Sequence, residues 1–181
     1  MMDLTRKSLP NVVMINGREY SIYTDFRLWM RFEIEVSKMK TTDNIDVSYL
    51  FKNEKPRYCN LEELFVFAKP ANELPRNFKH SNVRVLDYEV DAELIFSAFL
   101  EQYGIDLFEI EELHWHKFLA LLKGLNDSTR LREVMGYRSY EKSNEKNRDI
   151  YAELRAAWAL EEPISEEEQA ELEEFNKKFG G

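Results

Sequence analysis

The feature that most constrains the fold is the apolar stretch from Leu107 to Leu125, LFEIEELHWHKFLALLKGL. Placed on a helix at about 100° per residue, its apolar side chains cover roughly two-thirds of the circumference. The opposite side is held by Glu109, Glu112, His116, Ala120 and Lys123. A helix with so wide an apolar arc has to be buried against several neighbours. We therefore expect a central helix over residues 107–123.

A second helical pattern comes directly before this stretch. Apolar residues recur at three- and four-residue spacing after Asp87, namely Val90, Leu94, Ile95, Ala98 and Phe99, which is typical of one buried helix face. Asp87 is a good N-cap, and Gly104 is a suitable C-terminal stop. Asp106 with Glu109 resembles a capping box for the next helix. The short connection predicts an antiparallel helical hairpin.

The N-terminal part of the chain predicts a β-hairpin followed by helices. Residues 12–23 contain two short apolar runs around Asn16-Gly17, which is a strong hairpin signal because a type I′ turn needs positive φ twice. Thr24 or Asp25 then caps a helix to about Met39. Asp43 or Asn44 opens a short helix to Phe51, and Asn60 caps a helix that Pro70 ends. A basic, proline-marked loop over 70–84 follows, which we interpret as a solvated connection.

The C-terminal part predicts three further helices. The first is capped by Asp127 or Ser128, covers 129–135 and is ended by Gly136. The second covers 148–160. The third is acidic, begins at a capping box formed by residues 165–168 and carries a thin apolar stripe, made of Leu172, Phe175 and Phe179.

Together these patterns predict a mainly α, helical bundle-like domain of roughly six to eight helices with a short N-terminal β-hairpin. The chain has 181 residues and is 44% hydrophobic, which supports one core with room for an appendage. We place the helical domain over 1–138, including the hairpin over 12–23, and a helical acidic extension over 139–181.

Charge and hydropathy narrow the class of partner. The net charge is −9, which argues against unaided binding to nucleic acid, since a phosphate backbone requires clustered cations. A helix-turn-helix that directs Arg130, Arg132 and Arg138 toward phosphates is the alternative that this acidity disfavours. The start has no signal-peptide pattern, and no apolar run is long enough for a membrane span. We expect a soluble, cytoplasmic protein that binds neither nucleic acid nor membrane.

The sequence contains no convincing catalytic or metal-binding motif. His114 and His116 are two residues apart, so on a helix they would point about 200° apart and could not share a metal ion. We interpret His114 as a core histidine bonded to a backbone carbonyl and His116 as solvent-facing. Acidic pairs such as Asp87 with Asp91 are interpreted as caps and solvated faces. Cys59 has no positioned base near it in the sequence. We therefore expect no enzyme activity, no cofactor and no metal.

Large aromatic side chains are the candidate contacts for a protein partner. Trp29, Phe108 and Trp115 are candidates at the edges of the wide apolar faces, although burial in the core is favoured for each of them. The stripe of Leu172, Phe175 and Phe179 could dock on a partner helix or on the body of the protein itself.

A set of residues spread over the chain resembles the bacteriophage Gp15 family of long-tailed phages and prophages of Gram-positive bacteria. The resemblance runs from about Ile15 to Arg138 and does not include 40–84. It is carried by Asp25-Phe26 with Trp29 and Phe32, then Asp91, Phe99 and Tyr103-Gly104-Ile105-Asp106, then His114-Trp115 with Lys117-Phe118, and finally Tyr137-Arg138.

The resemblance implies a tail assembly chaperone without catalytic residues. Such a protein keeps the tape-measure protein soluble and helps tail-tube subunits polymerise around it. The implied partners are the tape-measure protein and the major tail protein. A ring or helical homo-oligomer would suit the coating of a long partner, because head-to-tail contacts either close or extend. A structural virion component, such as a tail or connector subunit, is the alternative.

Overall fold

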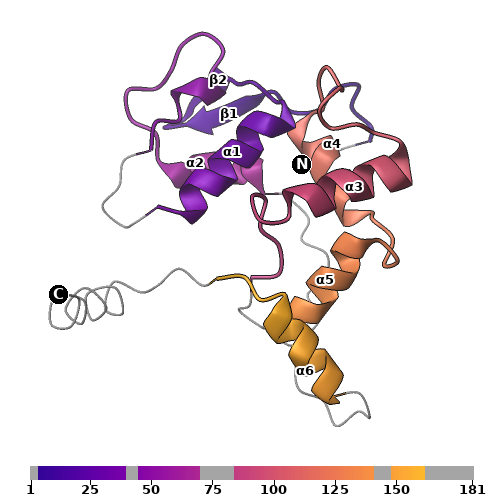
Figure 1. Ribbon diagram of the computed structural model, residues 1–181. Coiled ribbons are helices and arrows are strands. Elements are labelled where there is room, and N and C mark those ends of the chain that lie inside the picture. Colours follow the sequence, from indigo (N-terminus) through magenta and orange to yellow (C-terminus); the bar gives the residue numbers. More distant parts are fainter. Residues whose placement is uncertain (1–3, 40–44, 70–83, 141–147, 162–181) are drawn as a thin grey trace, which may run out of the picture.

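The structure is a computed structural model that describes residues 4–39, 45–69, 84–140 and 148–161. Within these ranges the chain forms six α-helices, one short 3₁₀ helix and a two-stranded hairpin (Figure 1). The predicted fold class, mainly α with a short N-terminal β-hairpin, is confirmed. The predicted acidic helix with Leu172, Phe175 and Phe179, the cap at 43–44 and most of the basic loop lie outside the described residues.

The hairpin forms where the Asn-Gly pair predicts it. Strand β1 (Val12–Ile15) pairs antiparallel with β2 (Arg18–Ser21). Asn16 and Gly17 between them have φ of 51° and 76°, the left-handed conformation that a type I′ turn requires at both central residues. One face of β1 is buried against helix α2 (Leu61–Ala68), which stabilises a hairpin that would be marginal alone.

Helices α1 (Phe26–Ser37) and α2 (Leu61–Ala68) begin at the predicted caps. The Asp25 carboxylate accepts a hydrogen bond from the Arg27 amide, and the Asn60 side chain accepts one from the Glu62 amide. Each bond satisfies a donor that the first turn of a helix leaves free. Between them the expected short helix is a single 3₁₀ turn, η1 (Ser48–Leu50).

Aromatic rings from four segments form the centre of the core. Phe118 stacks on Phe26, Phe99 and Trp115, with ring centroids 4.9, 5.1 and 5.6 Å apart. Trp29 packs on Phe67 at 4.5 Å. Offset contacts of this kind add to the free energy gained by burying the rings. The core therefore joins α1 and α2 to the second half of the chain.

The predicted helix over 107–123 is wrong in its first half. Helix α4 comprises only Trp115–Lys123, and residues 107–109 form a separate turn. The chain leaves the helical path because residues 113–115 bond to the start of α1: Phe26 N donates to Leu113 O (2.8 Å) and Trp115 N to Thr24 O (2.7 Å). The expected helical hairpin is therefore interrupted by a longer connection.

The preceding helix, α3 (Ala92–Tyr103), starts later than predicted and ends as predicted. Gly104 takes the left-handed conformation at φ 65°. Asp87 is an N-cap only of a separate turn, where its carboxylate accepts from the Glu89 and Val90 amides at 2.7 and 2.9 Å. Asp91 occupies the N-cap position of the helix.

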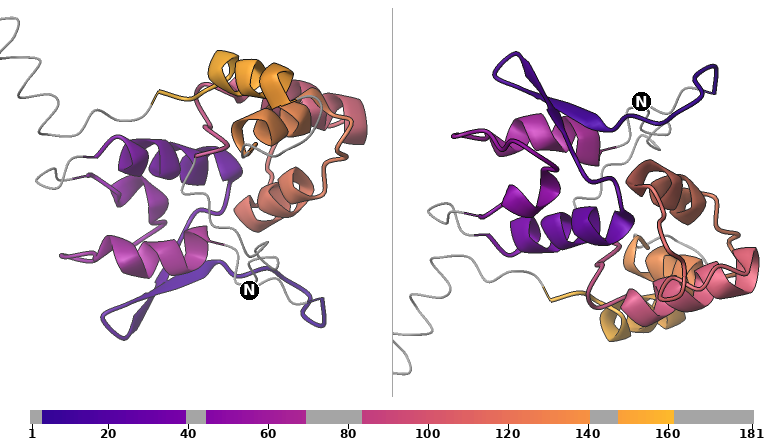
Figure 2. Two further views of the ribbon diagram at one scale, coloured as in Figure 1. Left: turned by 90° about the horizontal axis from the view of Figure 1, so that it is seen from below. Right: turned by 90° about the horizontal axis from the view of Figure 1, so that it is seen from above.

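Helices α5 (Arg130–Arg138) and α6 (Arg148–Ala157) pack on each other below the core (Figure 1). Gly136 does not end α5, since the helix continues to Arg138, whose buried side chain is fixed by several bonds. The views from below and above show α6 on the outer side of α5 (Figure 2).

Candidate protein-binding groove

An apolar groove lies between α1 and α3 on the surface of the core. Its volume is about 340 Å³. Its lining is apolar except for a few polar atoms and includes Phe26, Met30 and Ile34 from α1, Ile95 and Phe96 from α3, and Phe108 from the turn after α3. A concave apolar surface of this size is the usual form of a binding site for an apolar ligand or side chains.

Phe108 forms the most exposed part of the groove wall. Its side chain is 83% exposed, and its ring lies 5.3 Å from that of Phe96, centroid to centroid. An aromatic side chain that is this accessible beside an apolar groove is typical of a protein-binding surface.

The turn that carries Phe108 is fixed from both ends. The Asp106 carboxylate accepts hydrogen bonds from the Phe108 and Glu109 amides at 2.8 and 3.2 Å. The Arg27 guanidinium donates to the carbonyls of Leu107 and Ile110 at 2.9 and 2.7 Å. Arg27 also pairs with Asp25 at 3.0 Å, so α1 positions the rim of the groove.

Of the three predicted aromatic contacts in the described residues, only Phe108 is accessible. Trp29 and Trp115 are 0% and 1% exposed, and their indole N–H groups donate inside the protein, to Tyr23 O and Ala68 O. Both are core residues, as is usual for large aromatic side chains. The sequence does not identify Phe96, Met30 and Ile34 as groove residues, because it does not show whether an apolar helix face is covered by another element.

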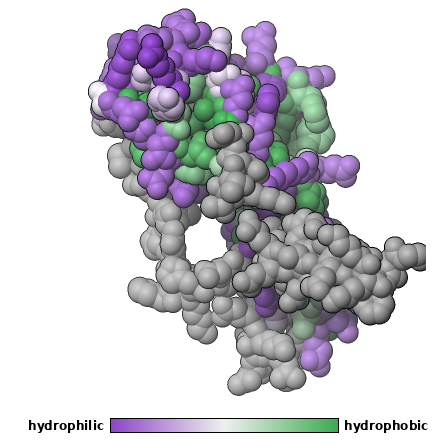
Figure 3. All heavy atoms as spheres, turned by 90° about the vertical axis from the view of Figure 1, so that its left-hand side faces the viewer, coloured by the Kyte–Doolittle hydropathy of each residue, from purple (hydrophilic) through white to green (hydrophobic). Residues whose placement is uncertain are grey.

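Apolar residues are exposed at several places on the surface besides the groove. Seen from the side of α1 and α2, hydrophobic residues are visible between hydrophilic ones in the coloured, upper part of the surface (Figure 3). Two exposed apolar residues on other elements are Val66 of α2 and Tyr58. Scattered exposed apolar residues are normal, so the groove is the better candidate for a binding surface.

The two histidines lie closer together than predicted. His114 is the N-cap of α4, with Nδ1 accepting from the His116 amide and Nε2 donating to Pro10 O at 2.9 Å. His116 is buried, not solvent-facing, and its Nε2 donates to Phe67 O at 2.8 Å. The helical-angle argument fails because His114 precedes the helix; the two ring centroids are 5.2 Å apart.

Burial lowers the pKa of both histidines below 6.5, against the smaller opposing effect of the bonds to Pro10 O and Phe67 O. Both rings are therefore neutral donors near neutral pH. Across the described ranges, no three His, Cys, Asp or Glu side chains form a metal-binding group.

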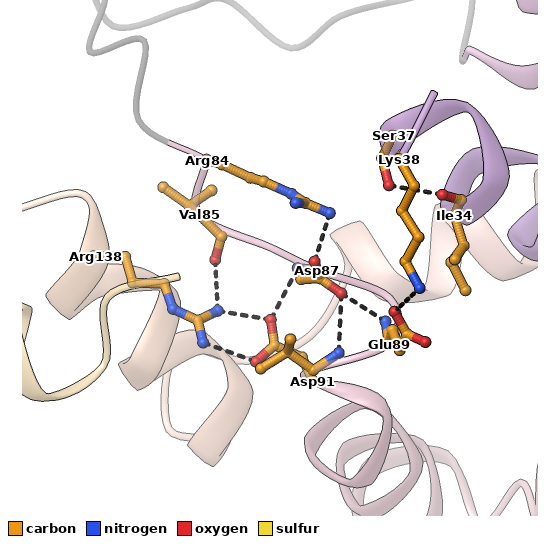
Figure 4. A network of polar contacts seen from close by, with 10 residues as sticks. Ile34, Ser37, Lys38, Arg84, Val85, Asp87, Glu89, Asp91 and Arg138 are labelled. Atoms are coloured by element: carbon orange, nitrogen blue, oxygen red, sulfur yellow. Dashed lines mark hydrogen bonds and ion pairs between the residues drawn. The ribbon is translucent and has the colours of Figure 1, made fainter. Parts of the chain in front are cut away.

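Arg138 and Asp91 form a buried ion pair (Figure 4). Arg138 Nη1 and Nη2 lie 2.6 and 2.9 Å from the two Asp91 oxygens, and the side chains are 3% and 1% exposed. The same guanidinium donates to Val85 O at 3.1 Å and Trp158 O at 2.7 Å. Asp91 is thus not on a solvated face, and Arg138 is not available to a phosphate.

Asp87 is also buried and hydrogen-bonded. Although burial alone would raise the pKa of its carboxyl group, the bonds from the Val90 and Glu89 amides and the charge of Arg84 leave this pKa below its usual value. Of the other arginines in the helix-turn-helix alternative, Arg130 pairs with Glu133 and Arg132 with Asp127. These carboxylates and arginines therefore pair with one another or with backbone groups of the same chain.

None of the helices in the described ranges is both long and apolar enough to cross a lipid bilayer. The longest has 12 residues.

The fold defines a small, mainly α-helical protein with a candidate binding groove on its surface. The comparison with protein families is more specific: the family described as Bacteriophage Gp15 protein matches residues 5–160. The chain belongs to this family, which places it among phage structural and morphogenesis proteins. The match includes 40–84 and continues past Arg138 through α6, beyond the limits of the resemblance in individual motifs. Comparisons with curated proteins and with solved structures found no match.

Proposed function

We propose that the protein is a non-enzymatic tail assembly chaperone that acts in the host cytoplasm. In this role the groove between α1 and α3 binds the apolar stripe of helices in the tape-measure protein. The observation that supports the proposal is the exposed Phe108 at the edge of an otherwise apolar groove, in a chain that belongs to a phage morphogenesis family.

Recognition of a helix in a groove explains why such a chaperone needs no catalytic group. An amphipathic helix presents apolar residues at i, i+3, i+4 and i+7, and these anchor it in an apolar groove. Phe108 would lose most of its exposed area on binding, which contributes on the order of 1.5–3 kcal/mol. A long tape-measure protein offers many such stripes, so several copies of the chaperone bind one chain, with contacts to the major tail protein or between copies aiding assembly.

Co-expression with the tape-measure protein, followed by size-exclusion chromatography with light scattering, tests the proposal. We expect the wild-type protein to keep the tape-measure protein soluble and to co-elute with it. Phe108→Ser should weaken this binding at least tenfold, because the rim of the groove loses its aromatic anchor.

Val66→Ser is the matched control, because Val66 is also apolar and 81% exposed but lies on α2, away from the groove. It should leave binding unchanged. Equal binding by both variants and wild type would contradict the role of the groove.

Mass spectrometry of purified phage particles distinguishes the chaperone from the alternative, a structural virion component. A structural component is present in the particles in stoichiometric amount, whereas an assembly chaperone is absent.

A further inference from the structure

The charged residues that line the groove are all positive and all lie on one helix. They are Arg27 and Arg31, both on α1. Arg31 lies over the Tyr49 ring and pairs with Glu35, yet more than half of its side chain is exposed. The groove therefore combines an apolar floor with an edge of two arginines, each paired with one carboxylate, Asp25 or Glu35. A ligand with apolar residues flanked by carboxylates can add to these pairs.

The C-terminal segment of the same chain has this chemistry. Over residues 165–179 it carries six glutamates and two lysines, Lys177 and Lys178, and is therefore acidic overall. Leu172, Phe175 and Phe179 recur at spacings of three and four residues, which on a helix would align them as one apolar stripe.

The described chain ends beside the groove. The Arg138 guanidinium binds Trp158 O and Val85 O together, so the residues that follow α6 lie close to the segment that leads into Tyr88 and Ala92, which line the groove. The yellow end of the described chain lies beside the C-terminal half of α1 in all three ribbon views (Figures 1 and 2).

The connection from this point is long enough. Ten residues separate Glu161 from Leu172. They span about 15 Å as a helix and about 33 Å when extended. Leu172, Phe175 and Phe179 are thus within reach of a groove that lies next to the point of departure.

We propose that the segment 165–179 binds the α1–α3 groove of its own chain when no partner occupies it, with the apolar stripe on the groove floor and the glutamates toward Arg27 and Arg31. The segment protects the exposed apolar surface and competes with an incoming helix. The competition rests on the proposed function; the occupancy of the groove by the segment does not.

Cross-linking of the free protein tests the occupancy. In a Cys59→Ser background, Ala92→Cys places a thiol at the exposed start of α3, in the groove wall, and Asn176→Cys places one in the segment. A short bismaleimide should join the two within one chain. The yield should be at least fivefold higher than for the control pair Val66→Cys with Asn176→Cys, whose first thiol lies on α2.

Two results would overturn the proposal. One is an equal yield for the two pairs, and the other is a product found only between two chains, which would assign the segment to a second copy. Replacing Phe175 and Phe179 by serine should abolish the preferential cross-link if the stripe holds the segment, and an unchanged cross-link would count against it.

A binding experiment separates this proposal from the chaperone role. A chain that ends at Glu161 should bind the tape-measure protein at least threefold more tightly than the full chain. A cross-link without any tape-measure binding would remove the chaperone role alone. If truncation leaves the binding of the tape-measure protein unchanged and no preferential cross-link forms, the segment does not occupy the groove. The chaperone role would then stand.

Discussion

At the scale of single residues, the guanidinium of Arg138 connects three other segments of the chain. It binds the Asp91 carboxylate at the start of α3 and the carbonyls of Val85 and Trp158, while its own backbone belongs to the end of α5. A buried ion pair of this kind stabilises little relative to an apolar replacement of both partners, but the loss of one partner leaves an uncompensated charge inside the protein.

We expect Arg138→Met to lower the free energy of unfolding by about 3–5 kcal/mol, because Asp91 would remain buried without its cation. Urea denaturation at pH 7 measures this change. The matched control is Arg132→Met, which removes an ion pair to the exposed Asp127 and should cost less than about 1 kcal/mol. Similar losses in the two variants would contradict the buried role of Arg138.

The sequence marked Asp91 and Arg138 as residues of interest but did not pair them. They are 47 positions apart, and a charged residue carries no local sign that it will be buried, since most are exposed. For the same reason Asp91 was expected on a solvated face. The burial of His116 does not follow from the sequence, because Phe67, which covers it, is 49 positions away on another helix.

At the scale of elements, local signals predicted some helix ends, whereas Asp87 caps only a turn and Gly136 does not end α5. Asp25, Asn60 and Gly104 act at the predicted positions because a cap depends on its immediate neighbours. The stretch 107–114 has apolar residues at helical spacing with those of α4, yet it forms a turn and a short bridge to α1. The spacing of apolar residues alone cannot distinguish a helix from an irregular segment with the same spacing.

Only one residue of the candidate groove could be predicted from the sequence. Phe108 was identified as a contact because it is a large aromatic residue at the edge of an apolar face, and the structure leaves it exposed. The opposite wall belongs to α1, which is more than 70 residues earlier in the sequence. A groove between two such elements depends on their packing, which a single sequence does not define.

Arg27 should control the rim of the groove through the turn that carries Phe108. Replacing it with methionine removes the donors to Leu107 O and Ile110 O. We expect amide hydrogen exchange in residues 108–110 to become at least tenfold faster, since these bonds restrain the local opening of the turn.

Arg31→Met is the matched control for this experiment, because Arg31 also lines the groove but bonds to Glu35 and not to the turn. Exchange in residues 108–110 should stay as in the wild type. If both substitutions accelerate exchange equally, general loss of charge on α1 is responsible and Arg27 does not position the turn.

At the scale of the whole molecule, the two histidines join the N-terminal segment and α2 to α4. His114 binds Pro10 O and His116 binds Phe67 O, and both bonds need only the neutral imidazole. Protonation would place a charge in each buried ring. For His116 it would also add a donor at Nδ1, which is buried without a hydrogen-bond partner.

We expect the folded protein to lose stability as the pH falls below about 6.5. Burial lowers the pKa of both histidines in the folded state below the value of 6.5 that applies to the unfolded chain. The unfolded state therefore binds more protons in this window, so stability decreases toward acid pH, by up to about 1.4 kcal/mol per pH unit for each histidine.

Urea denaturation at pH 7.5 and 5.5 measures this effect, and His116→Gln supplies the comparison. The variant should show a smaller loss of unfolding free energy between the two pH values, because one of the two depressed groups no longer titrates. An identical pH dependence in the variant and the wild type would exclude His116 as a source of the acid sensitivity.

The bridge between Asp25 and His114 sets the order in which the chain can fold during translation. Leu113 N donates to Asp25 Oδ2 across 88 residues, and the rings that cover Phe26 belong to α4. At a synthesis rate of about 5–20 residues per second, α1 leaves the ribosome roughly 4–18 s before this partner. During that interval its aromatic face is exposed in the nascent polypeptide, so the N-terminal half completes its core only after the C-terminal half has been synthesised.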